Sequence, residues 1–258
     1  MLRAFVLRIE GWEGVELKPV SPSLEISVLL DHGDGETVGL YCYDPVYGHV
    51  IPLPSFQEQG KLRSSAGLVG MYVVLAEKGV EGLEGRWYQK AVDILARKHL
   101  LPRDGTPDWE RPLNRGQAAR MLALASGVPG KQSRVKGFRD LKTGELVPYV
   151  ETLADRGLVF GYPDGTFRPD CPLTRAEMAR LILRFWGKTP NQGADVKGDL
   201  PFKDVPRDHW AYETIKAACA LGFVSGYPDG TFKPEEAVSW AEGASMMTRA
   251  FKSLEIRR

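Results

Sequence analysis

The sequence predicts an α+β multidomain protein, in which a β-rich N-terminal module precedes an all-α array of repeats. Within the first 80 or so residues, segments alternate or run apolar with many β-branched residues, which is typical of strands. The heptapeptide GYPDGTF occurs at Gly161–Phe167 and again, unchanged, at Gly226–Phe232. Apolar residues at helical spacing flank the second copy. Because a long identical segment marks a repeated structural unit, we expect the rest of the chain to be a repeat array.

Residues 1–80 are expected to form the β-rich module. Strands are predicted at Leu2–Ile9, Leu24–Leu30, Thr37–Tyr43 and Met71–Leu75. Asp31–Gly35 is predicted to be the turn of a hairpin between the second and third of these strands. Val50–Pro54 is predicted to be an edge strand or an extended link, because proline cannot donate a hydrogen bond to a sheet. Glu77–Gly85, with three glycines, is the expected linker.

The repeat extends beyond the heptapeptide in both directions. Phe138–Leu141 matches Phe202–Val205 upstream, and Pro169–Glu177 matches Pro234–Glu242 downstream. An eroded earlier copy keeps the motifs Asp104-Gly105-Thr106 and Pro112-Leu113-Asn114-Arg115. We therefore predict three repeats, at residues 85–130, 138–188 and 202–258.

The last repeat illustrates the expected unit, which is helix, ordered loop, helix. Asp208 is expected to cap a first helix that begins near His209, and Gly222 to end that helix in the left-handed conformation. Pro228–Gly230 is predicted to be a tight turn, which Phe232 anchors to the core. The residues expected on the inner helix faces are Trp210, Ile215, Ala218 and Leu221, then Ala244, Met247 and Phe251.

The second helix of each repeat begins with a capping pattern. Thr174-x-x-Glu177 and Ser239-x-x-Glu242 are capping boxes, and Asn114-x-x-Gln117 is the neutral version. Each cap is expected to stabilise its helix by about 1 kcal/mol.

Capping does not require the arginine that follows the cap at Arg115 and Arg175, where the third repeat has Trp240. An arginine in the first helical turn slightly opposes the helix dipole. Two explanations stay open: an anionic partner, or an acidic side chain of a neighbouring repeat.

The motifs Phe-x-Asp-Val, His-Trp-Ala, Gly-Tyr-Pro-Asp-Gly-Thr-Phe-x-Pro and Leu-Thr-Arg-Ala-Glu resemble the S-layer homology (SLH) domain, which usually occurs in threes. The resemblance covers about two thirds of the chain and is weaker in residues 85–130, which lack the Gly-Tyr pair and the Phe-x-Asp-Val motif. It implies a pseudo-trimer, folded as a three-pronged helical spindle. It also implies non-covalent anchoring at the bacterial surface, through secondary cell-wall polysaccharide that is often pyruvylated and binds in grooves between prongs. Self-assembly, or assembly into a larger surface or particle structure, is a further expectation.

The resemblance also implies which residues hold the polymer. A guanidinium can hold a ketal carboxylate by two parallel bonds, and free amides at a helix N-terminus favour the same charge. Aromatic faces and turn residues would lie nearby, although packing explains the tyrosines and the tryptophan equally well, and the glycines could simply permit the turn. The candidate polysaccharide-binding residues are Arg115, Arg175, Trp210, Gly161, Tyr162, Asp164, Gly226, Tyr227, Asp229 and Trp240. Because the repeats differ, one or two working grooves are expected.

Two variants separate binding from structure at this stage. Arg175→Ala is predicted to weaken polymer binding with an almost unchanged melting temperature. Glu177→Ala is predicted to lose stability before affinity.

A second, looser resemblance concerns the N-terminal module. The motifs Tyr41-x-Tyr43-Asp44, Pro52-Leu53-Pro54 and Gly70-x-Tyr72-Val73-Val74 resemble the end of β-sandwich modules that often precede SLH triplets. A β-sandwich-like fold is therefore expected for this module.

Composition excludes several classes of function. A formal net charge of +1 gives no general attraction to nucleic acid or to acidic membranes. Three scattered cysteines and four isolated histidines indicate no disulfide framework, metal site or cofactor site, and nothing marks a catalytic residue, so the protein is not expected to be an enzyme. No apolar run has the length of a membrane-spanning helix.

The expected location is the cell surface, yet residues 1–20 do not read as a signal peptide, because Arg3, Arg8 and Glu10 interrupt the apolar start. Three explanations stay open. The chain is a fragment of a longer surface protein, or it is exported without an N-terminal signal, or it belongs to a particle such as a phage virion that attaches to a host wall. An assembly scaffold that binds no glycan is a further alternative.

Overall fold

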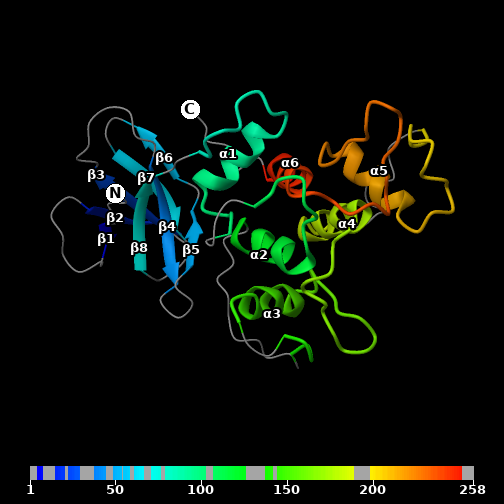
Figure 1. The fold of residues 1–258 in the computed structure, drawn as a ribbon. Helices are drawn as coiled ribbons and strands as arrows, with labels where there is room; N and C mark the ends of the chain where they lie inside the picture. Colours follow the sequence, from blue (N-terminus) through cyan, green and yellow to red (C-terminus); the bar gives the residue numbers. More distant parts are fainter. Residues whose placement is uncertain are drawn as a thin grey trace. The chain divides into compact units, whose positions relative to one another are not determined.

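The computed structural model divides into two compact units, which are described separately (Figure 1). The first unit comprises residues 1–101, 124–129 and 253–258, and the second comprises residues 102–123 and 130–252. The described residues are 5–7, 15–20, 23–29, 38–44, 49–53, 55–58, 61–66, 71–76, 79–102, 107–125, 137–141, 144–188 and 198–251.

The first unit contains two four-stranded antiparallel sheets, followed in sequence by helix α1 (Gln89–Arg97). One sheet has the strand order β1-β8-β4-β5, and the other has the order β2-β3-β7-β6. The strands are β1 Phe5–Leu7, β2 Val15–Val20, β3 Ser23–Leu29, β4 Val38–Asp44, β5 His49–Pro52, β6 Ser55–Glu58, β7 Lys61–Ala66 and β8 Met71–Ala76.

The predicted hairpin between β3 and β4 is wrong, because the two strands belong to different sheets. β3 pairs with β2 and β7, whereas β4 pairs with β5 and β8. The predicted turn at 31–35 lies outside the described residues. An alternating apolar pattern shows that a segment is a strand, but it carries no information about which strand will be its partner. For Val50–Pro54, predicted to be an edge strand or an extended link, the edge strand is confirmed at residues 50–52, since β5 ends its sheet.

Three strands, β2, β6 and β7, were not predicted from the sequence. β2 contains Pro19 and lies at a sheet edge, where a missing amide is tolerated. β7 is central in its sheet although its sequence is largely polar, and only Leu62 supplies a large apolar side chain. That one residue is almost fully buried, so tertiary packing outweighs the weak local pattern.

Buried apolar side chains of β4, β5, β7 and β8, and of α1 with Val92 and Leu95, make the core of the first unit. The largest of these contributions come from Leu40, Tyr41, Ile51, Leu62 and Val73. The Tyr41 hydroxyl donates to the backbone oxygen of Arg97 at 2.7 Å, and its ring meets the His99 ring edge-on at 5.0 Å. These contacts join β4 to the C-terminal end of α1.

The second unit is helical in its described part (Figure 1). Its helices are α2 Arg115–Ala125, whose last two residues belong to the first unit, α3 Val147–Asp155, α4 Arg175–Phe185, α5 Tyr212–Ala220 and α6 Trp240–Ala250. α4 packs against both α5 and α6. The expected inner residues of α6 are buried, which confirms the predicted face of this helix: Ala244, Met247 and Phe251.

The predicted caps of all three second helices are present. Thr174 and Ser239 form complete capping boxes with the glutamates three positions later. Asn114 accepts from the Gln117 amide at 2.8 Å, and the Gln117 side chain accepts from the Asn114 amide at 3.0 Å. The neutral version therefore makes the same pair of bonds.

The predicted start of α5 is wrong. The helix begins at Tyr212, and no side chain caps it, because residues 206–212 form successive turns instead. Trp210 lies in these turns and is 51% exposed, and Leu221 after the other end of the helix is 42% exposed, so the predicted inner position is wrong for both residues. The predicted inner face is correct in the middle of the helix, where Ile215 and Ala218 are fully buried. The predicted left-handed end is also correct, since Gly222 has a φ of 73°.

The loops that precede α2, α4 and α6 form a closed ring of backbone hydrogen bonds. The Leu113 amide donates to Val238 at 2.8 Å, Val238 donates to Leu173 at 2.9 Å, and Leu173 donates back to Leu113 at 3.0 Å. All three side chains are buried. Each of these residues immediately precedes an N-cap, so the ring fixes the starts of the three helices relative to one another.

The first two amides of each of these helices also have partners in the next loop of the ring. Arg115 and Gly116 donate to Cys171 and Pro169, Arg175 and Ala176 to Glu236 and Pro234, and Trp240 and Ala241 to Arg111 and Trp109, all at 2.9–3.0 Å. The orphan donors that a helix N-terminus ordinarily leaves are thus satisfied within the protein.

Candidate functional site

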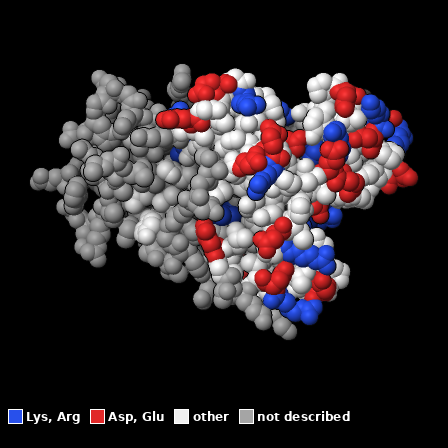
Figure 2. Space-filling model, viewed as in Figure 1, with Lys and Arg blue, Asp and Glu red and all other residues white. Residues whose placement is uncertain are grey.

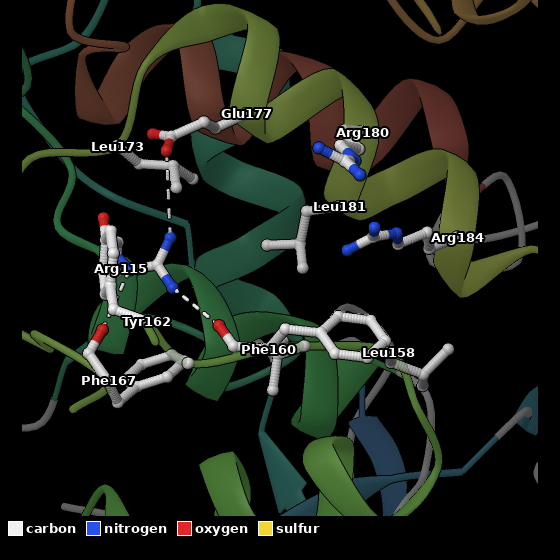
Figure 3. A pocket seen from close by; sticks show the side chains of 12 residues that line it. Arg115, Leu158, Phe160, Tyr162, Phe167, Leu173, Glu177, Arg180, Leu181 and Arg184 are labelled. Carbon is white, nitrogen blue, oxygen red and sulfur yellow. Dashed lines mark hydrogen bonds and ion pairs between the residues drawn. The ribbon is translucent and has the colours of Figure 1, made fainter. Parts of the chain in front are cut away.

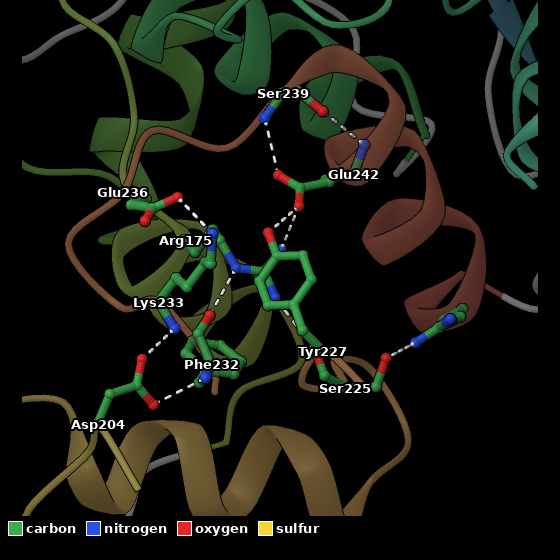
Figure 4. Close-up of polar contacts among 10 residues, drawn as sticks. Arg175, Asp204, Ser225, Tyr227, Phe232, Lys233, Glu236, Ser239 and Glu242 are labelled. Atoms are coloured by element: carbon green, nitrogen blue, oxygen red, sulfur yellow. Dashed lines mark hydrogen bonds and ion pairs between the residues drawn. The ribbon is translucent and has the colours of Figure 1, made fainter. Parts of the chain in front are cut away.

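Arg175 is buried at the start of α4, and its guanidinium is fully paired with residues that lie between α5 and α6 or on α6 (Figure 4). Nε donates to the Phe232 backbone oxygen at 2.8 Å, and Nη2 donates to the Ser225 backbone oxygen at 3.1 Å. Nη1 pairs with Glu242 at 2.9 Å. The guanidinium also lies 4.5 Å from the centre of the Tyr227 ring. An acidic neighbour, one of the two explanations left open by the sequence, therefore accounts for this arginine.

Glu242 joins the cap of α6 to this arginine. Its Oε2 accepts from the Ser239 amide at 3.0 Å, which is half of the capping box. Its Oε1 pairs with Arg175 and also accepts a hydrogen bond from the Tyr227 hydroxyl (Figure 4). Burial, and then the bond to Glu242, raise the pKa of Tyr227. The network leaves only 4% of the Arg175 side chain exposed, so this position is closed.

Arg115 repeats the arrangement at the start of α2, but more loosely. Nε donates to the Phe167 backbone oxygen at 3.0 Å, and Nη2 donates to the Phe160 backbone oxygen at 3.1 Å. The carboxylate of Glu177 lies 3.9 Å from Nη1, and 32% of the Glu177 side chain is exposed, against 15% for its counterpart in α6. Among the described residues, the Tyr162 hydroxyl makes no bond to this carboxylate. The same motif is thus closed at Arg175, which has a short buried ion pair, and open at Arg115, which has a long and partly exposed one.

At the third position the side chain is different. Trp240 stands where the other two helices have arginine, and it is 3% exposed. A buried indole cannot offer its face to a sugar, so the structure does not support the expected contact of Trp240 with a ligand.

The expectation of free amides at the helix N-termini is also wrong. Arg175 and Ala176 give their amides to neighbouring backbone oxygens, and Glu177 gives its amide to the Thr174 hydroxyl at 3.2 Å. The next amide, of Met178, is bonded to the Thr174 carbonyl in the helix. An anion near α4 must therefore be held by side chains.

The aspartates of the two heptapeptides stabilise their own turns. Asp164 accepts from the amide and the hydroxyl of Thr166 at 3.0 and 2.6 Å, and Asp229 does the same with Thr231 at 2.9 and 2.6 Å. The Thr166 hydroxyl, and then Arg168, hold the pKa of Asp164 well below its usual range. These bonds give both aspartates a structural role in the turn.

Asp204 of the Phe-x-Asp-Val motif and its counterpart Asp140 bind the backbone amides that follow the same turns. Asp140 accepts from the amides of Phe167 and Arg168 at 2.8 and 2.7 Å, and Asp204 makes the same two bonds in the later copy. The second amide of each pair belongs to a residue with positive φ, 57° at Arg168 and 58° at Lys233. The carboxylate thus supports a backbone conformation that L-residues otherwise avoid.

The two heptapeptide glycines are required by packing. A Cβ at Gly161 would lie 2.6 Å from the Thr166 oxygen and would strike the Phe138 ring, and a Cβ at Gly226 would lie 2.7 Å from the Thr231 oxygen. Of the two roles considered for these glycines, the structure favours the turn.

Trp210 is the sequence-predicted aromatic residue that is most exposed. Its Nε1 donates to Glu235 at 2.8 Å, and its ring stacks on His209 with the centroids 5.7 Å apart. The guanidinium of Arg180 lies 5.8 Å from the ring centre.

A cavity of about 390 Å³ lies beside Arg115 (Figure 3). Its wall includes Tyr162, which the sequence predicted, and one face of α4. The lining residues are Arg115, Leu158, Val159, Phe160, Gly161, Tyr162, Phe167, Leu173, Glu177, Arg180, Leu181 and Arg184. Three arginines and one glutamate give the cavity an excess of positive charge.

Of the lining residues, only Arg115, Gly161 and Tyr162 were proposed from the sequence as binding residues, and Phe160, Arg180 and Arg184 in particular were missed. A signal was present, because Glu177, Arg180 and Arg184 are spaced three and four apart and so share one helix face. A comparison of Arg180 and Arg184 with the residues 65 positions later, Ser245 and Arg249 of α6, would also have shown that the two copies differ.

Other kinds of site have no support in the described part of the chain. These residues contain no group of three or more His, Cys, Asp or Glu side chains placed to hold a metal ion. None of their helices is long and apolar enough to cross a membrane. Acidic and basic side chains are interspersed on the face of the molecule that Figure 2 shows. Burial raises the pKa of Cys219 to about 11, so this thiol stays protonated at neutral pH.

The sequence profile of the S-layer homology domain matches residues 137–179 and 201–242. These two segments are S-layer homology domains. The first contains Arg175, and the second contains Tyr227, Phe232 and Glu242, so the buried ion pair joins one SLH domain to the next. Arg115 lies outside both matched segments, while its partners lie inside the first.

Several similar bacterial proteins have names that refer to the cell surface, to anchoring or to the cell wall. Cell surface glycoprotein 1 of Acetivibrio thermocellus is 35% identical over 160 residues, which is 58% of this chain and 7% of that protein. The cellulosome-anchoring protein of the same organism is 36% identical over 150 residues, 55% of this chain and 33% of that protein. An uncharacterized cell wall amidase of Bacillus anthracis is 31% identical over 181 residues, 68% of this chain and 32% of that protein. The chain thus aligns with a third or less of each relative.

Proposed function

We propose that this chain anchors non-covalently to the bacterial cell wall by binding secondary cell-wall polysaccharide in the cavity beside Arg115. The observation that carries the proposal is the contrast between two copies of one motif. Arg175 is closed off by Glu242 at 2.9 Å, whereas Arg115 has its carboxylate at 3.9 Å and lines a cavity. A carboxylate of the polymer, such as a pyruvate ketal, can pair with Arg115 without breaking a short ion pair.

The remaining lining suits a sugar. Tyr162 and Phe160 supply aromatic surface, and the Arg115 guanidinium lies 5.1 Å from the centre of the Tyr162 ring. A volume of about 390 Å³ falls in the range of small-ligand sites. In this proposal Arg175, Asp164 and Asp229 act indirectly, by holding the loops and helices in place.

The relatives support a surface location, since their names describe cell-surface, anchoring and cell-wall proteins. Cell-surface location is therefore part of the proposal for this chain, and we further propose that these repeats act by binding rather than by catalysis. No partner other than the wall polymer is invoked.

We also propose that residues 85–130 form a third, divergent SLH repeat. Support comes from Asn114 and Gln117, which reproduce the capping box, and from Leu113, which completes the backbone ring with its two counterparts. For the N-terminal strands we propose a β-sandwich-like module, supported by the contacts that β4 of one sheet makes with β6 and β7 of the other.

The test is retention of the purified chain on isolated cell walls, before and after chemical removal of the secondary polymer. Untreated walls should retain the chain and stripped walls should not. Arg115→Ala should lower retention about tenfold or more, the effect of losing one charge-assisted contact. Arg111→Ala is the control, because the side chain of this neighbouring arginine is 80% exposed and, among the described residues, pairs only with the exposed Asp108. Equal retention on both kinds of wall would refute the proposal.

A further inference from the structure

We infer that the cavity beside Arg115 contains a second anion subsite, formed by Arg180 and Arg184 above Phe160. The inference rests on the proposed function and narrows it, since the ligand would be a polymer segment with two anionic groups. Arg115 would hold one of these groups, and the α4 arginines would hold the other. The relevant side chains are shown in Figure 3.

Arg180 and Arg184 are two like charges close together, with no acidic partner among the described residues. They are four residues apart on one face of α4, where like charges destabilise a helix. Neither has an ion pair or a hydrogen bond to another described residue. Burial, and then the nearby charge of Arg180, lower the pKa of Arg184. An anion between the guanidinium groups would relieve this repulsion and use their free donors.

Phe160 positions one of these charges. The Arg184 guanidinium lies 4.6 Å from the centre of the Phe160 ring, a cation–π contact that holds it at the cavity wall. Phe160 is 56% exposed, so part of its side chain is open to a ligand.

The copy of this motif 65 residues later provides an internal comparison. Ser245 stands in place of Arg180, so one charge is missing there. Arg249 stands in place of Arg184, but its Nη1 donates to the Ser225 hydroxyl at 2.7 Å. Ser225 in turn replaces Phe160. The closed position therefore has neither the second arginine, nor the exposed ring, nor an arginine without a partner.

The chemistry of the ligand follows from these groups. Guanidinium groups bind carboxylate and phosphate oxygens in the same way, so the second anion is an acidic substituent of either kind on the polymer. The lining Tyr162 and the exposed Phe160 ring leave room for sugar rings between the two charges. A polysaccharide with isolated single charges would occupy only one of the two anion subsites, and a neutral polysaccharide would occupy neither.

The experiment measures retention of the full chain on isolated cell walls at increasing NaCl concentration. Arg184→Ser is expected to lower retention about tenfold at low salt and to flatten the salt dependence, because one charge-assisted contact is lost. Arg249→Ser is the matched control in the closed copy and should leave retention unchanged. Arg180→Ser introduces the residue type that the later copy has at this position, Ser245, and it should also lower retention. The melting temperature of both α4 variants should stay within a few degrees of the parent's, because each arginine loses only a cation–π contact and no ion pair or hydrogen bond to another described residue.

The outcomes separate the inference from the proposed function. Equal retention of the parent and Arg184→Ser at every salt concentration would overturn the second subsite, while retention itself would uphold anchoring. Walls that retain neither protein would overturn both. Walls whose carboxylates have been reduced to alcohols identify the anion: the parent-to-variant ratio falls to one for a carboxylate and persists for a phosphate, and either result supports the subsite.

Discussion

Glu242 pairs with Arg175 at 2.9 Å through one carboxylate oxygen and caps its own helix through the other. The helix cap and the link to the neighbouring segment therefore depend on a single side chain. Glu177 has the same two neighbours in the earlier copy, yet it lies 3.9 Å from Arg115. One sequence motif thus produces both a structural lock and an open site.

We predict that Arg175→Ala destabilises the fold by about 3–5 kcal/mol, the cost of breaking a buried ion pair and leaving its carboxylate unpaired. This replaces the sequence-based prediction of an unchanged melting temperature, which ignored burial. Urea unfolding followed by circular dichroism measures the change. Arg249→Ala, on the exposed side of α6, should cost less than about 0.5 kcal/mol. Equal stability of the two variants would show that the buried network contributes little.

We predict that Glu177→Gln increases retention on cell walls. Glutamine keeps the capping bond, as Gln117 does for Asn114, but removes the negative charge that competes with a ligand for Arg115. Stability should change by less than about 1 kcal/mol, because this ion pair is partly exposed and long. Wall retention and thermal unfolding are the two measurements.

Glu242→Gln is the matched control for that variant. It makes the same chemical change in the closed copy, where Arg175 is buried, so it should lower the melting temperature without raising retention. Increased retention for both variants, or for neither, would contradict the assignment of open and closed positions.

The sequence was most informative where a local pattern determines the structure. The capping boxes, the tight turns and the inner face of α6 depend on residues within a few positions of one another, and each was predicted correctly. The strand partners could not be predicted, because pairing of β3 with β7 is a long-range choice that the alternating pattern does not encode.

The candidate site was predicted only in part, for a related reason. Arg115 and Tyr162 line the cavity as expected, because the motif identified them. Arg175 and Trp240 are buried because segments from other repeats cover them, and the sequence of a single repeat does not show which segments these are. Arg184 was missed because its importance appears only in comparison with Arg249. In the later copy Arg249 donates a hydrogen bond to the Ser225 hydroxyl, whereas Arg184 has no hydrogen bond to another described residue.

We predict that acid weakens the fold partly through Asp140. Burial alone would raise the pKa of this carboxyl, but the amides of Phe167 and Arg168 outweigh burial and lower it. The folded pKa therefore lies below the unfolded value of about 4, so the carboxylate stabilises the fold above that pH. This contribution is lost as the pH falls through the folded pKa. Asp140→Asn should reduce stability at pH 7 and flatten its decline below about pH 4.

Urea unfolding at a series of pH values tests the role of Asp140, with Asp170→Asn in an exposed loop as the control. An unchanged pH profile for Asp140→Asn would mean that other carboxylates dominate the acid response.

We predict that Gly226→Ala destabilises the fold by about 1–3 kcal/mol, because the added methyl would overlap the Phe202 ring and lie 2.7 Å from the Thr231 oxygen. Gly137→Ala is a suitable control, since its methyl would meet only the movable end of the Glu151 side chain. Adding Phe202→Leu to Gly226→Ala should recover part of the loss, because the smaller side chain removes one of the two clashes. A double variant whose loss equals the sum of the single losses would show that the glycine and the ring are not coupled. Thermal unfolding of the four variants provides the comparison.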